Sequence, residues 1–271
     1  MADRELPQHQ TPSDHGTRLV PVRPGNPAAG RAVRALVTGA SEGIGRAVAV
    51  SLAKHGYAVT AVARGVEALE TLMAELGGGH DYLAADLGTE DGLRSVAERL
   101  RHGGYTLLVN NAGTAGHGDF SAVALESALA TLDLNCRAVV VLSHAFLAAA
   151  TPGSALVNVS STLGSTPKPG MAVYSASKAF VTAFSETLWH EQKARGVRVL
   201  ALCPGVTATA SQSAADVPSW LIRTPEQVAD RTRKALAGNA GPIVHSSRIN
   251  RAFAAALRLL PRRAAMALLA D

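Results

Sequence analysis

The sequence predicts an α/β domain in which helices cover both faces of a parallel sheet. Seven short apolar runs alternate with segments in which apolar residues recur at helical spacing, and this alternation is typical of a parallel, doubly wound sheet. The composition agrees, because 47% of the residues are hydrophobic and only 4% are aromatic, which suits buried strands between alanine-rich helices. The 271 residues are enough for one domain of ordinary size. We therefore expect a single three-layer domain.

The apolar runs give the positions of the strands, and the helical patterns between them give the helices. The expected strands are residues 33–37, 58–63, 82–85, 106–109, 155–159, 197–202 and 242–245. The expected helices lie near residues 45–55, 66–76, 90–102, 121–150, 172–195 and 225–238. The last of them begins with Thr224 before Pro225, a good start signal. No fixed period repeats along the chain, which argues against a solenoid or a propeller.

The N-terminal arm, residues 1–30, differs from the predicted domain at residues 31–247. It holds five of the thirteen prolines and almost no large apolar side chains, so we expect it to be disordered. It lacks the apolar core of a secretory signal, and no run in the chain reaches the roughly twenty uncharged apolar residues that cross a bilayer. Cys136 and Cys203 lie in apolar runs without a CxxC or a Cys/His cluster, which argues against disulfides and metal sites. These features favour a soluble, cytoplasmic protein.

The C-terminal tail, residues 248–271, carries more apolar side chains than a free chain end needs. A helix from about Ile249 to Leu260 would align these two residues with Phe253 and Ala256, and Pro261 would interrupt it. The tail could pack onto the protein's own substrate cleft, pack on a second subunit, or lie on an anionic membrane. We rank these hypotheses in that order. Net charge is +5, but the basic residues are scattered apart from "RLLPRR" in this tail, so we expect no nucleic-acid partner.

Three glycines follow the first predicted strand in "TGASEGIG", residues 38–45. In dinucleotide sites a first glycine makes the tight turn, a second lets the backbone approach the pyrophosphate, and a third permits close helix packing. Gly39, Gly43 and Gly45 have this spacing, and the phosphates would meet free N–H groups at the helix N-terminus. A glycine-rich loop that merely joins strand to helix is the alternative.

The end of the second predicted strand indicates which dinucleotide would bind. An acid at this position would bond a ribose 2′-hydroxyl and favour NAD, but the chain has Ala63 there, followed by Arg64. A guanidinium suits a 2′-phosphate, so the sequence predicts NADP(H). Alternatively, Arg64 only solvates the strand end. Asp86, after the third strand, is either an adenine contact or a solvated loop acid.

Ser161 ends the fifth predicted strand in "VNVSSTLG", and "YSASK" follows it. Tyr174 and Lys178 are one helical turn apart, so their side chains share a face. A nearby ammonium and a cationic nicotinamide would favour the phenolate and lower the pKa of the tyrosine. Ser161 could then bind a carbonyl oxygen and Tyr174 could protonate it. A helix with one tyrosine and one lysine is the alternative for this pair taken alone.

These motifs, with "NNAG" and "CPGVTAT", occur in an order that resembles the short-chain dehydrogenase/reductase superfamily over residues 31 to about 246. The resemblance implies a Rossmann fold and a homodimer or homotetramer. It implies that Ser161 binds the carbonyl, that Tyr174 is the acid/base, and that Lys178 lowers its pKa and holds the nicotinamide ribose. Asn135, in "LDLNCRA", matches the asparagine that holds a water in a proton relay.

The resemblance also implies the cofactor contacts. Asn111 would lie near the adenosine ribose, Asp86 and Leu87 would flank adenine, Thr207 would contact the carboxamide, and Thr209 would approach the nicotinamide. The full set of expected cofactor-binding residues is Gly39, Ser41, Gly43, Ile44, Gly45, Arg64, Asp86, Leu87, Asn111, Tyr174, Lys178, Pro204, Gly205, Thr207 and Thr209.

The expected function is NADPH-dependent reduction of a ketone, aldehyde or 3-oxoacyl carbonyl. Residues 208–223 would form a substrate lid with Trp220 as a large apolar group. No charge cluster in this segment indicates an anionic substrate, so we expect a neutral or weakly polar one. The alternatives are an alcohol dehydrogenase that works in the oxidative direction and a non-enzymatic NADP(H)-binding sensor or scaffold.

Overall fold

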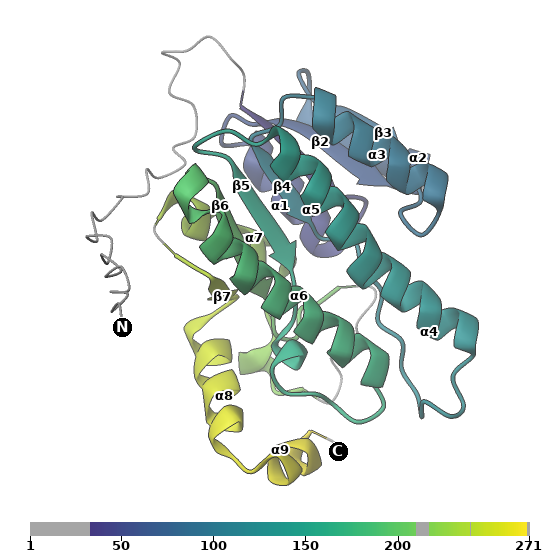
Figure 1. Cartoon of the computed structure of the whole chain (residues 1–271), viewed down its shortest axis with the longest axis vertical. Helices are drawn as coiled ribbons and strands as arrows, with labels where there is room; N and C mark the ends of the chain where they lie inside the picture. The colour runs from purple at the N-terminus through teal and green to yellow at the C-terminus, as the bar shows by residue number, and fades with distance from the viewer. Residues whose placement is uncertain (1–32, 210–216, 239, 270–271) are drawn as a thin grey trace, which may run out of the picture.

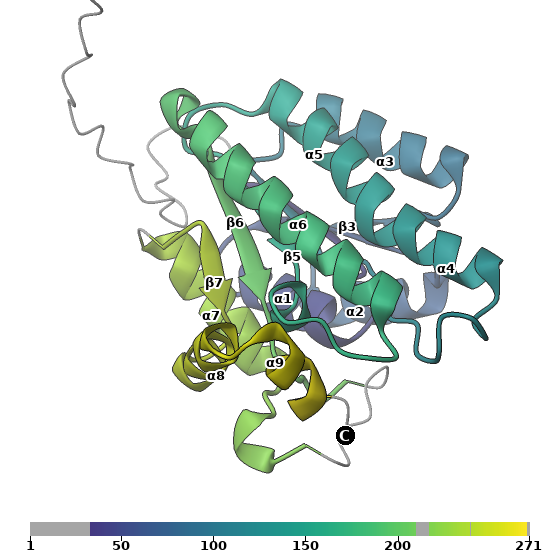
Figure 2. The same cartoon turned by 60° about the horizontal axis from the view of Figure 1, so that its bottom comes forward.

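The computed structural model describes residues 33–209, 217–238 and 240–269 (Figure 1). The predicted N-terminal arm and the centre of the predicted lid therefore lie outside the described residues. The rest is one layered α/β unit with helices on both faces of a central sheet (Figures 1 and 2).

Seven parallel strands form the sheet in the order β3-β2-β1-β4-β5-β6-β7. Their bounds are β1 Arg34–Thr38, β2 Ala58–Ala63, β3 Asp81–Ala84, β4 Leu107–Asn110, β5 Ala155–Val159, β6 Arg198–Cys203 and β7 Ile243–His245. Each agrees with the sequence prediction to within one residue at either end, and the doubly wound sheet is confirmed. Because the chain changes direction between β1 and β4, a crevice opens at the carboxyl ends of these neighbours, where ligands bind in such sheets.

Two groups of helices cover the two faces. The first consists of α1 Gly43–Ala53, α2 Val66–Leu76 and α7 Pro225–Ala237, and the second of α3 Glu90–His102, α5 Ala138–Ala149 and α6 Ala172–Glu191. Figure 2 shows α6, α5 and α3 side by side on one face. Alternate strand residues supply the two cores: in β1, Ala35 and Val37 face α1, whereas Leu36 faces the side of α3 and α5. The strands are therefore buried on both faces, as their continuous apolar runs predict.

The helix expected over residues 121–150 is one helical run in three parts. α4 (Leu125–Leu132) continues through a π-helical turn, η2 (Asp133–Arg137), into α5. By length and composition alone the run Leu125–Ala149 could cross a membrane, although only by a test that core helices of soluble proteins also pass. Here α5 packs against α3, and α4 packs against α6.

The tail forms two helices, α8 (Arg248–Leu259) and α9 (Arg262–Leu268), separated at Pro261 as expected. The apolar face that the sequence aligns is not the face that packs within this chain. Ile249 and Leu260 are 43% and 42% exposed, and Ala256 is exposed as well. The buried residues of α8 are instead Asn250, Ala254 and Leu257.

A polar anchor explains the rotated face of α8. The side-chain amide of Asn250 donates to Ser246 Oγ over 2.9 Å, and Asn250 packs so closely on Gly205 that a Cβ there would overlap its amide. Ser247 caps the helix by accepting from the Asn250 N–H over 3.0 Å. Apolar spacing assigns an asparagine to the solvent-exposed face of a helix. It therefore could not predict that Asn250 attaches α8 to the segment after β6.

The first turn of α1 packs directly on the end of β1. Gly39 turns the chain with φ of +62°, a conformation that favours glycine. A Cβ on Gly45 would overlap the carbonyl oxygen of Gly39 and the side-chain amide of Asn111. Glycine at these two positions therefore brings the helix N-terminus against the crevice between β1 and β4.

We expect Gly45→Ala to lower the free energy of unfolding by about 1–3 kcal/mol, the usual cost of overpacking a tight contact. Gly78→Ala is the matched control, because nothing lies within 4 Å of a Cβ at that position. Chemical denaturation of both variants and the parent measures the effect. Equal stability of the two variants would contradict the packing role of Gly45.

Candidate active site

The ends of β1 and β4 are held together by Thr38 and Asn111. Thr38 Oγ1 accepts from the backbone N–H groups of Asn111 and Ala112 over 2.9 and 3.0 Å. In return, Asn111 Nδ2 donates to the carbonyls of Thr38 and Gly39 over 3.0 and 3.1 Å. Asn111, expected near an adenosine ribose, thus directs its amide at the glycine loop and positions that loop.

The N-terminus of α1 has the features of an anion site. Glu42, which precedes it, makes no side-chain cap, and its first turn contains no acidic residue. Its N–H groups are therefore not engaged by a side-chain cap, as phosphate binding at a helix N-terminus requires. A Cβ on Gly43 would lie 3.1 Å from Thr209 Cγ2, which leaves a narrow cradle between the loop and the segment after β6. Ser41 and Ile44 are half-buried in this loop.

The ends of β2 and β3 lie beside this loop. Ala63 is buried and pairs in register with Ala84, whereas Arg64 follows it and is exposed. Asp86 is exposed and its Oδ1 accepts from the Gly88 N–H over 2.9 Å, which closes a local turn. Leu87 is buried in the core beside α3, only 5% exposed. Arg64 is thus free to reach a ligand at this edge, and Asp86 shapes the neighbouring loop.

Ser161 follows β5 and begins a short 3₁₀ turn, η3 (Thr162–Gly164). Its Oγ accepts from the Leu163 N–H over 3.1 Å. The Thr162 N–H in turn donates to the Pro204 carbonyl over 2.9 Å. These bonds fix the serine between the ends of β5 and β6.

The helix α6 is docked onto this turn through its backbone. Ser160 Oγ donates to the Lys178 carbonyl over 2.7 Å and also lies 2.7 Å from Thr182 Oγ1. A Cβ on Gly164 would lie 2.7 Å from the same carbonyl. This close contact sets the height of α6 relative to β5, and it brings Tyr174 and Lys178 beside Ser161.

Lys178 is a buried lysine that forms no ion pair with an acidic side chain among the described residues. Its Nζ donates to the Val159 carbonyl over 2.9 Å and lies 5.7 Å from the centre of the Tyr174 ring. A Cβ on Gly113 would approach Nζ to 3.4 Å. Burial lowers the pKa of Lys178 to about 8, because the charged form loses its hydration.

Tyr174 is 9% exposed. Burial raises its pKa, and a hydrogen bond with the Ser161 side chain acts in the opposite direction. The phenol therefore remains protonated at neutral pH, which is the form that donates a proton. The pKa lowering that the sequence analysis attributed to Lys178 and a cationic nicotinamide stays a prediction for the cofactor-bound site.

Asn135 lies in the π turn and is fully buried. Its Nδ2 donates to the Thr114 carbonyl and to Ser177 Oγ over 2.9 and 3.0 Å, and its Oδ1 accepts from the Thr114 N–H over 2.9 Å. The wider π turn directs this side chain inward. Asn135 therefore joins the loop after β4 to α6.

The segment after β6 meets both the glycine loop and the tail. The Gly205 N–H donates to Ser246 Oγ over 3.3 Å, and Thr207 Oγ1 donates to the Gly205 carbonyl over 3.2 Å. Thr207 is buried and forms a parallel bridge with Arg223. Within the described part of the predicted lid, residues Ser219–Leu221 form a 3₁₀ turn and Trp220 is 54% exposed.

A cavity of about 370 Å³ opens beside Ser161. Its lining residues flank η3 or come from α6, β6, β7 and α8: Ser161, Ser165, Thr182, Cys203, Ile243, His245, Arg251, Ala254, Ala255, Arg258 and Leu259. Two arginines and a histidine, all outside the predicted lid, are among these lining residues. Burial raises the pKa of Cys203 to about 11, although hydrogen bonds with Thr182 and Ser160 act in the opposite direction.

The sequence prediction followed the apolar face of the tail helix and did not assign Arg251 and Arg258 to a substrate site. Arg251 and Arg258 are seven residues apart, which on a helix places them on one face two turns apart. Two alanines between them leave that face open. This spacing was the signal available in the sequence. The fold then places the two arginines near His245, at the end of β7.

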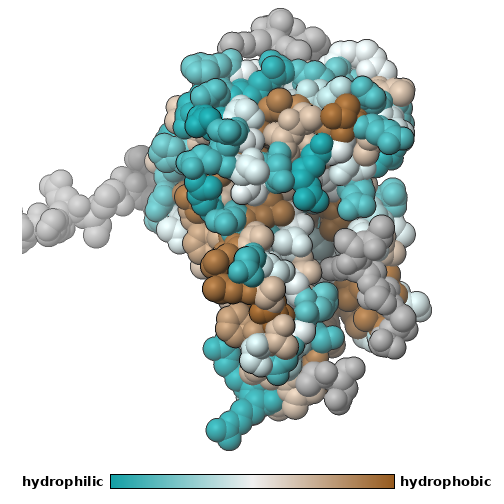
Figure 3. Space-filling view, turned by 90° about the vertical axis from the view of Figure 1, so that its right-hand side faces the viewer, coloured by the Kyte–Doolittle hydropathy of each residue, from teal (hydrophilic) through white to brown (hydrophobic). Residues whose placement is uncertain are grey.

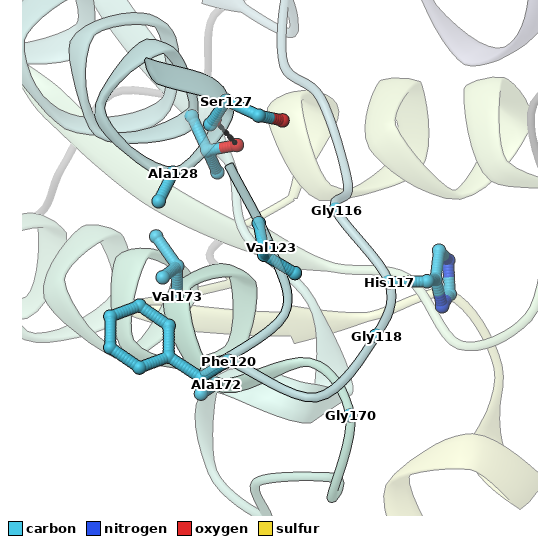
Figure 4. A pocket seen from close by; sticks show the side chains of 11 residues that line it. Gly116, His117, Gly118, Phe120, Val123, Ser127, Ala128, Gly170, Ala172 and Val173 are labelled. Atoms are coloured by element: carbon cyan, nitrogen blue, oxygen red, sulfur yellow. Dashed lines mark hydrogen bonds between the residues drawn. The ribbon is translucent and has the colours of Figure 1, made fainter. Parts of the chain in front are cut away.

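A second, smaller cavity of about 20 Å³ lies beyond the start of α6. Figure 4 shows Val123, Val173 and Phe120 around it, with the His117 ring turned away from them. Its volume is near that of one water molecule, so it offers no room for a substrate. Among the residues that the structure describes, no cluster of His, Cys, Asp and Glu could hold a metal ion.

Comparison with known proteins agrees with this geometry. A family model described as short chain dehydrogenase matches residues 33–218. The 3-oxoacyl-acyl-carrier-protein reductase FabG of Haemophilus influenzae is 33% identical over 179 residues, which cover 65% of this chain and 74% of that protein. The D-erythrulose reductase of Gallus gallus is 37% identical over 183 residues, covering 66% and 73% of the two chains.

Solved structures show the same fold. A putative NAD(P)-dependent gluconate 5-dehydrogenase from Beutenbergia cavernae, with bound NADP at low occupancy, has a TM-score of 0.72 and 31% identity, covering 79% of this chain and 95% of that one. A short-chain dehydrogenase from Sphingobium yanoikuyae in complex with NADPH has a TM-score of 0.72 and 28% identity, covering 84% and 96%. With its family match, its parallel sheet and its glycine crevice, this chain belongs to the short-chain dehydrogenase/reductase family.

Proposed function

We propose that this protein is an NADPH-dependent reductase that converts a ketone, aldehyde or 3-oxoacyl carbonyl to an alcohol. The observation that carries this proposal is the grouping of Ser161, Tyr174 and Lys178 beside a glycine loop. Relatives named as reductases, for a 3-oxoacyl thioester and for erythrulose, support the direction. A sensor or scaffold would not need a hydrogen-bonded serine and tyrosine next to a buried lysine.

NADP(H) is the cofactor that these residues fit. The uncapped N-terminus of α1 and the cradle at Gly43 suit a pyrophosphate, and the exposed Arg64 suits a 2′-phosphate. Two of the similar solved structures contain NADP or NADPH. When bound, the reduced nicotinamide supplies the hydride that reaches the carbonyl carbon.

Side chains of this protein then donate the proton and stabilise the negative charge that develops on the carbonyl oxygen. Ser161 Oγ donates a hydrogen bond to the carbonyl oxygen, and Tyr174 transfers its proton to the same oxygen as negative charge grows there. The raised pKa of Tyr174 keeps this proton in place until the oxygen becomes basic. Lys178 holds the cofactor ribose through its ammonium, while Asn135 supports the neighbouring loop and α6.

The oxidative direction needs the opposite state of Tyr174. To accept a proton from an alcohol, the tyrosine must first be deprotonated. Because burial raises the pKa of Tyr174, this form is rare at neutral pH. Because proton transfer is microscopically reversible, the ratio of reduced to oxidised cofactor, not the tyrosine, decides the net direction.

A homo-oligomer is consistent with the surface of the molecule. Large apolar side chains are exposed on α4, α5 and α6: Leu125, Leu129, Leu132, Val140 and Phe180. Figure 3 shows apolar residues gathered in the lower half of the face on which α4 lies. A second copy of the chain would cover such a surface.

Replacing Tyr174 by phenylalanine should lower kcat by about 10²-fold or more, because the general acid is lost while the ring remains. NADPH affinity should change much less. Steady-state loss of NADPH absorbance and fluorescence titration measure the two quantities. Tyr82→Phe is the control, since Tyr82 is partly exposed and bonds only to Glu70; near-normal turnover in Tyr174→Phe would refute the assignment.

NADPH binding should weaken as pH rises through about 8, the pKa of Lys178. Below this pH the side chain is an ammonium, and above it the neutral amine loses a charge-assisted contact, for an increase in Kd of roughly tenfold or more. Titrations at constant ionic strength from about pH 6.5 to about 9.5 measure the change. Lys178→Met should lack the break and the exposed control Lys168→Met should retain it, so a flat profile in the parent would contradict the role of Lys178.

The double variant Ala63→Asp with Arg64→Ile should shift preference from NADPH to NADH. It removes a contact to the 2′-phosphate worth about 1.5–3 kcal/mol, repels that phosphate, and adds an acceptor for a 2′-hydroxyl. The ratio of kcat/KM for the two cofactors measures the shift. Arg101→Ile, at an exposed position of α3, controls for a general loss of positive charge; an unchanged ratio in the double variant would exclude the Arg64 contact.

A further inference from the structure

The cavity beside Ser161 has a polar and cationic wall that the reduction chemistry does not use. Ser161 lies on its rim, while His245, Arg251 and Arg258 lie on the opposite elements β7 and α8. Its volume of about 370 Å³ is in the range of small-molecule sites. A molecule bound there could therefore reach Ser161 with one end and the cationic wall with the other.

The polar groups on this wall have no protein partner in the described residues. Arg251 and Arg258 make no side-chain hydrogen bond or ion pair among residues 33–209, 217–238 and 240–269. His245 Nδ1 is buried and also lacks a hydrogen-bond partner there. By contrast, Arg233 and Lys234 on the nearby α7 both pair with Asp230. Arg251 and Arg258 are therefore available to bind a ligand in the cavity.

The three side chains also interact with one another electrostatically. Burial lowers the pKa of His245, and the charges of Arg251, Arg258 and Arg231 lower it further. Arg231 is tied to the backbone, since its Nε donates to the His245 carbonyl over 3.2 Å. Because no carboxylate lines the cavity, the positive potential there is uncompensated by the lining residues. An anion would relieve this repulsion and accept hydrogen bonds from the arginines.

The remaining wall is apolar. Ile243, Ala254, Ala255 and Leu259 contribute it, and the two alanines leave space between the arginines. This surface suits a short hydrocarbon segment between a carbonyl and an anionic group.

We propose that this cavity selects carbonyl substrates that carry an anionic group, a carboxylate or a phosphate, joined to the carbonyl by a short apolar segment. Arg251 and Arg258 bind the anionic group, and the carbonyl lies at Ser161. The inference rests on the proposed reductase function and names its substrate class. It replaces the expectation of a neutral substrate.

The test compares straight-chain oxo acids, with the carboxylate about two to five carbons from the ketone, with their methyl esters. Each pair differs in charge at one end, so the acid-to-ester ratio of kcat/KM isolates the anion contact. The variants are Arg251→Gln, Arg258→Gln and the double variant. Arg262→Gln is the matched control, because Arg262 is exposed on α9 and does not line the cavity.

We expect the parent and Arg262→Gln to prefer the best acid over its ester, and the double variant to lose roughly 10- to 100-fold of that ratio. Equal kcat/KM for acids and esters in the parent would overturn the proposal. So would an unchanged ratio in the double variant.

A binding experiment separates this inference from the reductase function. If no carbonyl compound is reduced by the parent, the proposed function fails, and calorimetric titration of the oxo acids into the NADP-bound protein decides the site. Binding to the parent that is lost in the double variant would support an anion site, and absence of binding would overturn it. Inorganic phosphate is titrated in parallel; binding of phosphate alone would mean a free-anion site and would count against a substrate role.

Discussion

The contact between the end of β5 and the backbone of α6 is the interaction on which the candidate site depends. Ser160 bonds the Lys178 carbonyl, and the Lys178 side chain returns to the Val159 carbonyl. These two bonds cross between strand and helix in opposite directions, so neither element can slide without breaking one of them. The buried ammonium has a carbonyl as its hydrogen-bond partner, which is a weak compensation for lost hydration. The same two bonds hold α6 against the end of β5, which places Tyr174, one helical turn before Lys178, beside Ser161.

A polar seam through the apolar core extends this alignment to the centre of the sheet. Asn110 and Asn158 are paired in register on β4 and β5 and share a 2.9 Å hydrogen bond. Asn110 also donates to Ser143 on α5, and Asn158 donates to Ser185 on α6. Polar groups buried in this way favour one alignment, because any shift leaves an amide without a partner. The seam thus fixes both helices relative to the strands that carry the site.

The sequence predicted what depends on local pattern and missed what depends on packing. Strands that are buried on both faces appear in the sequence as apolar runs. Gly39 predicts a tight turn, and Gly45 predicts close packing of the helix on the preceding loop. The burial of Asn250 was not predictable, because its place is determined by Ser246 and by the missing side chain of Gly205. The cationic wall was missed for a related reason: Arg251 and Arg258 read as solvated charges until β7 and α8 meet. Tyr174 lies beside Ser161 and Lys178, as the sequence predicts, but the direction of its pKa shift depends on burial, which sequence spacing does not measure.

The thiol of Cys203 lies on the wall of the cavity beside Ser161, and this position has a chemical consequence. Carbonyl compounds are electrophiles, and a thiolate next to one would be trapped as a covalent adduct. With a pKa of about 11, the Cys203 sulfur remains a thiol at physiological pH and reacts slowly. Burial therefore protects the protein from alkylation by aldehydes and from mild oxidants, while the small sulfhydryl still fills the wall. A change that admitted water or a cation beside this sulfur would make the protein vulnerable to inactivation by the very class of compound it handles.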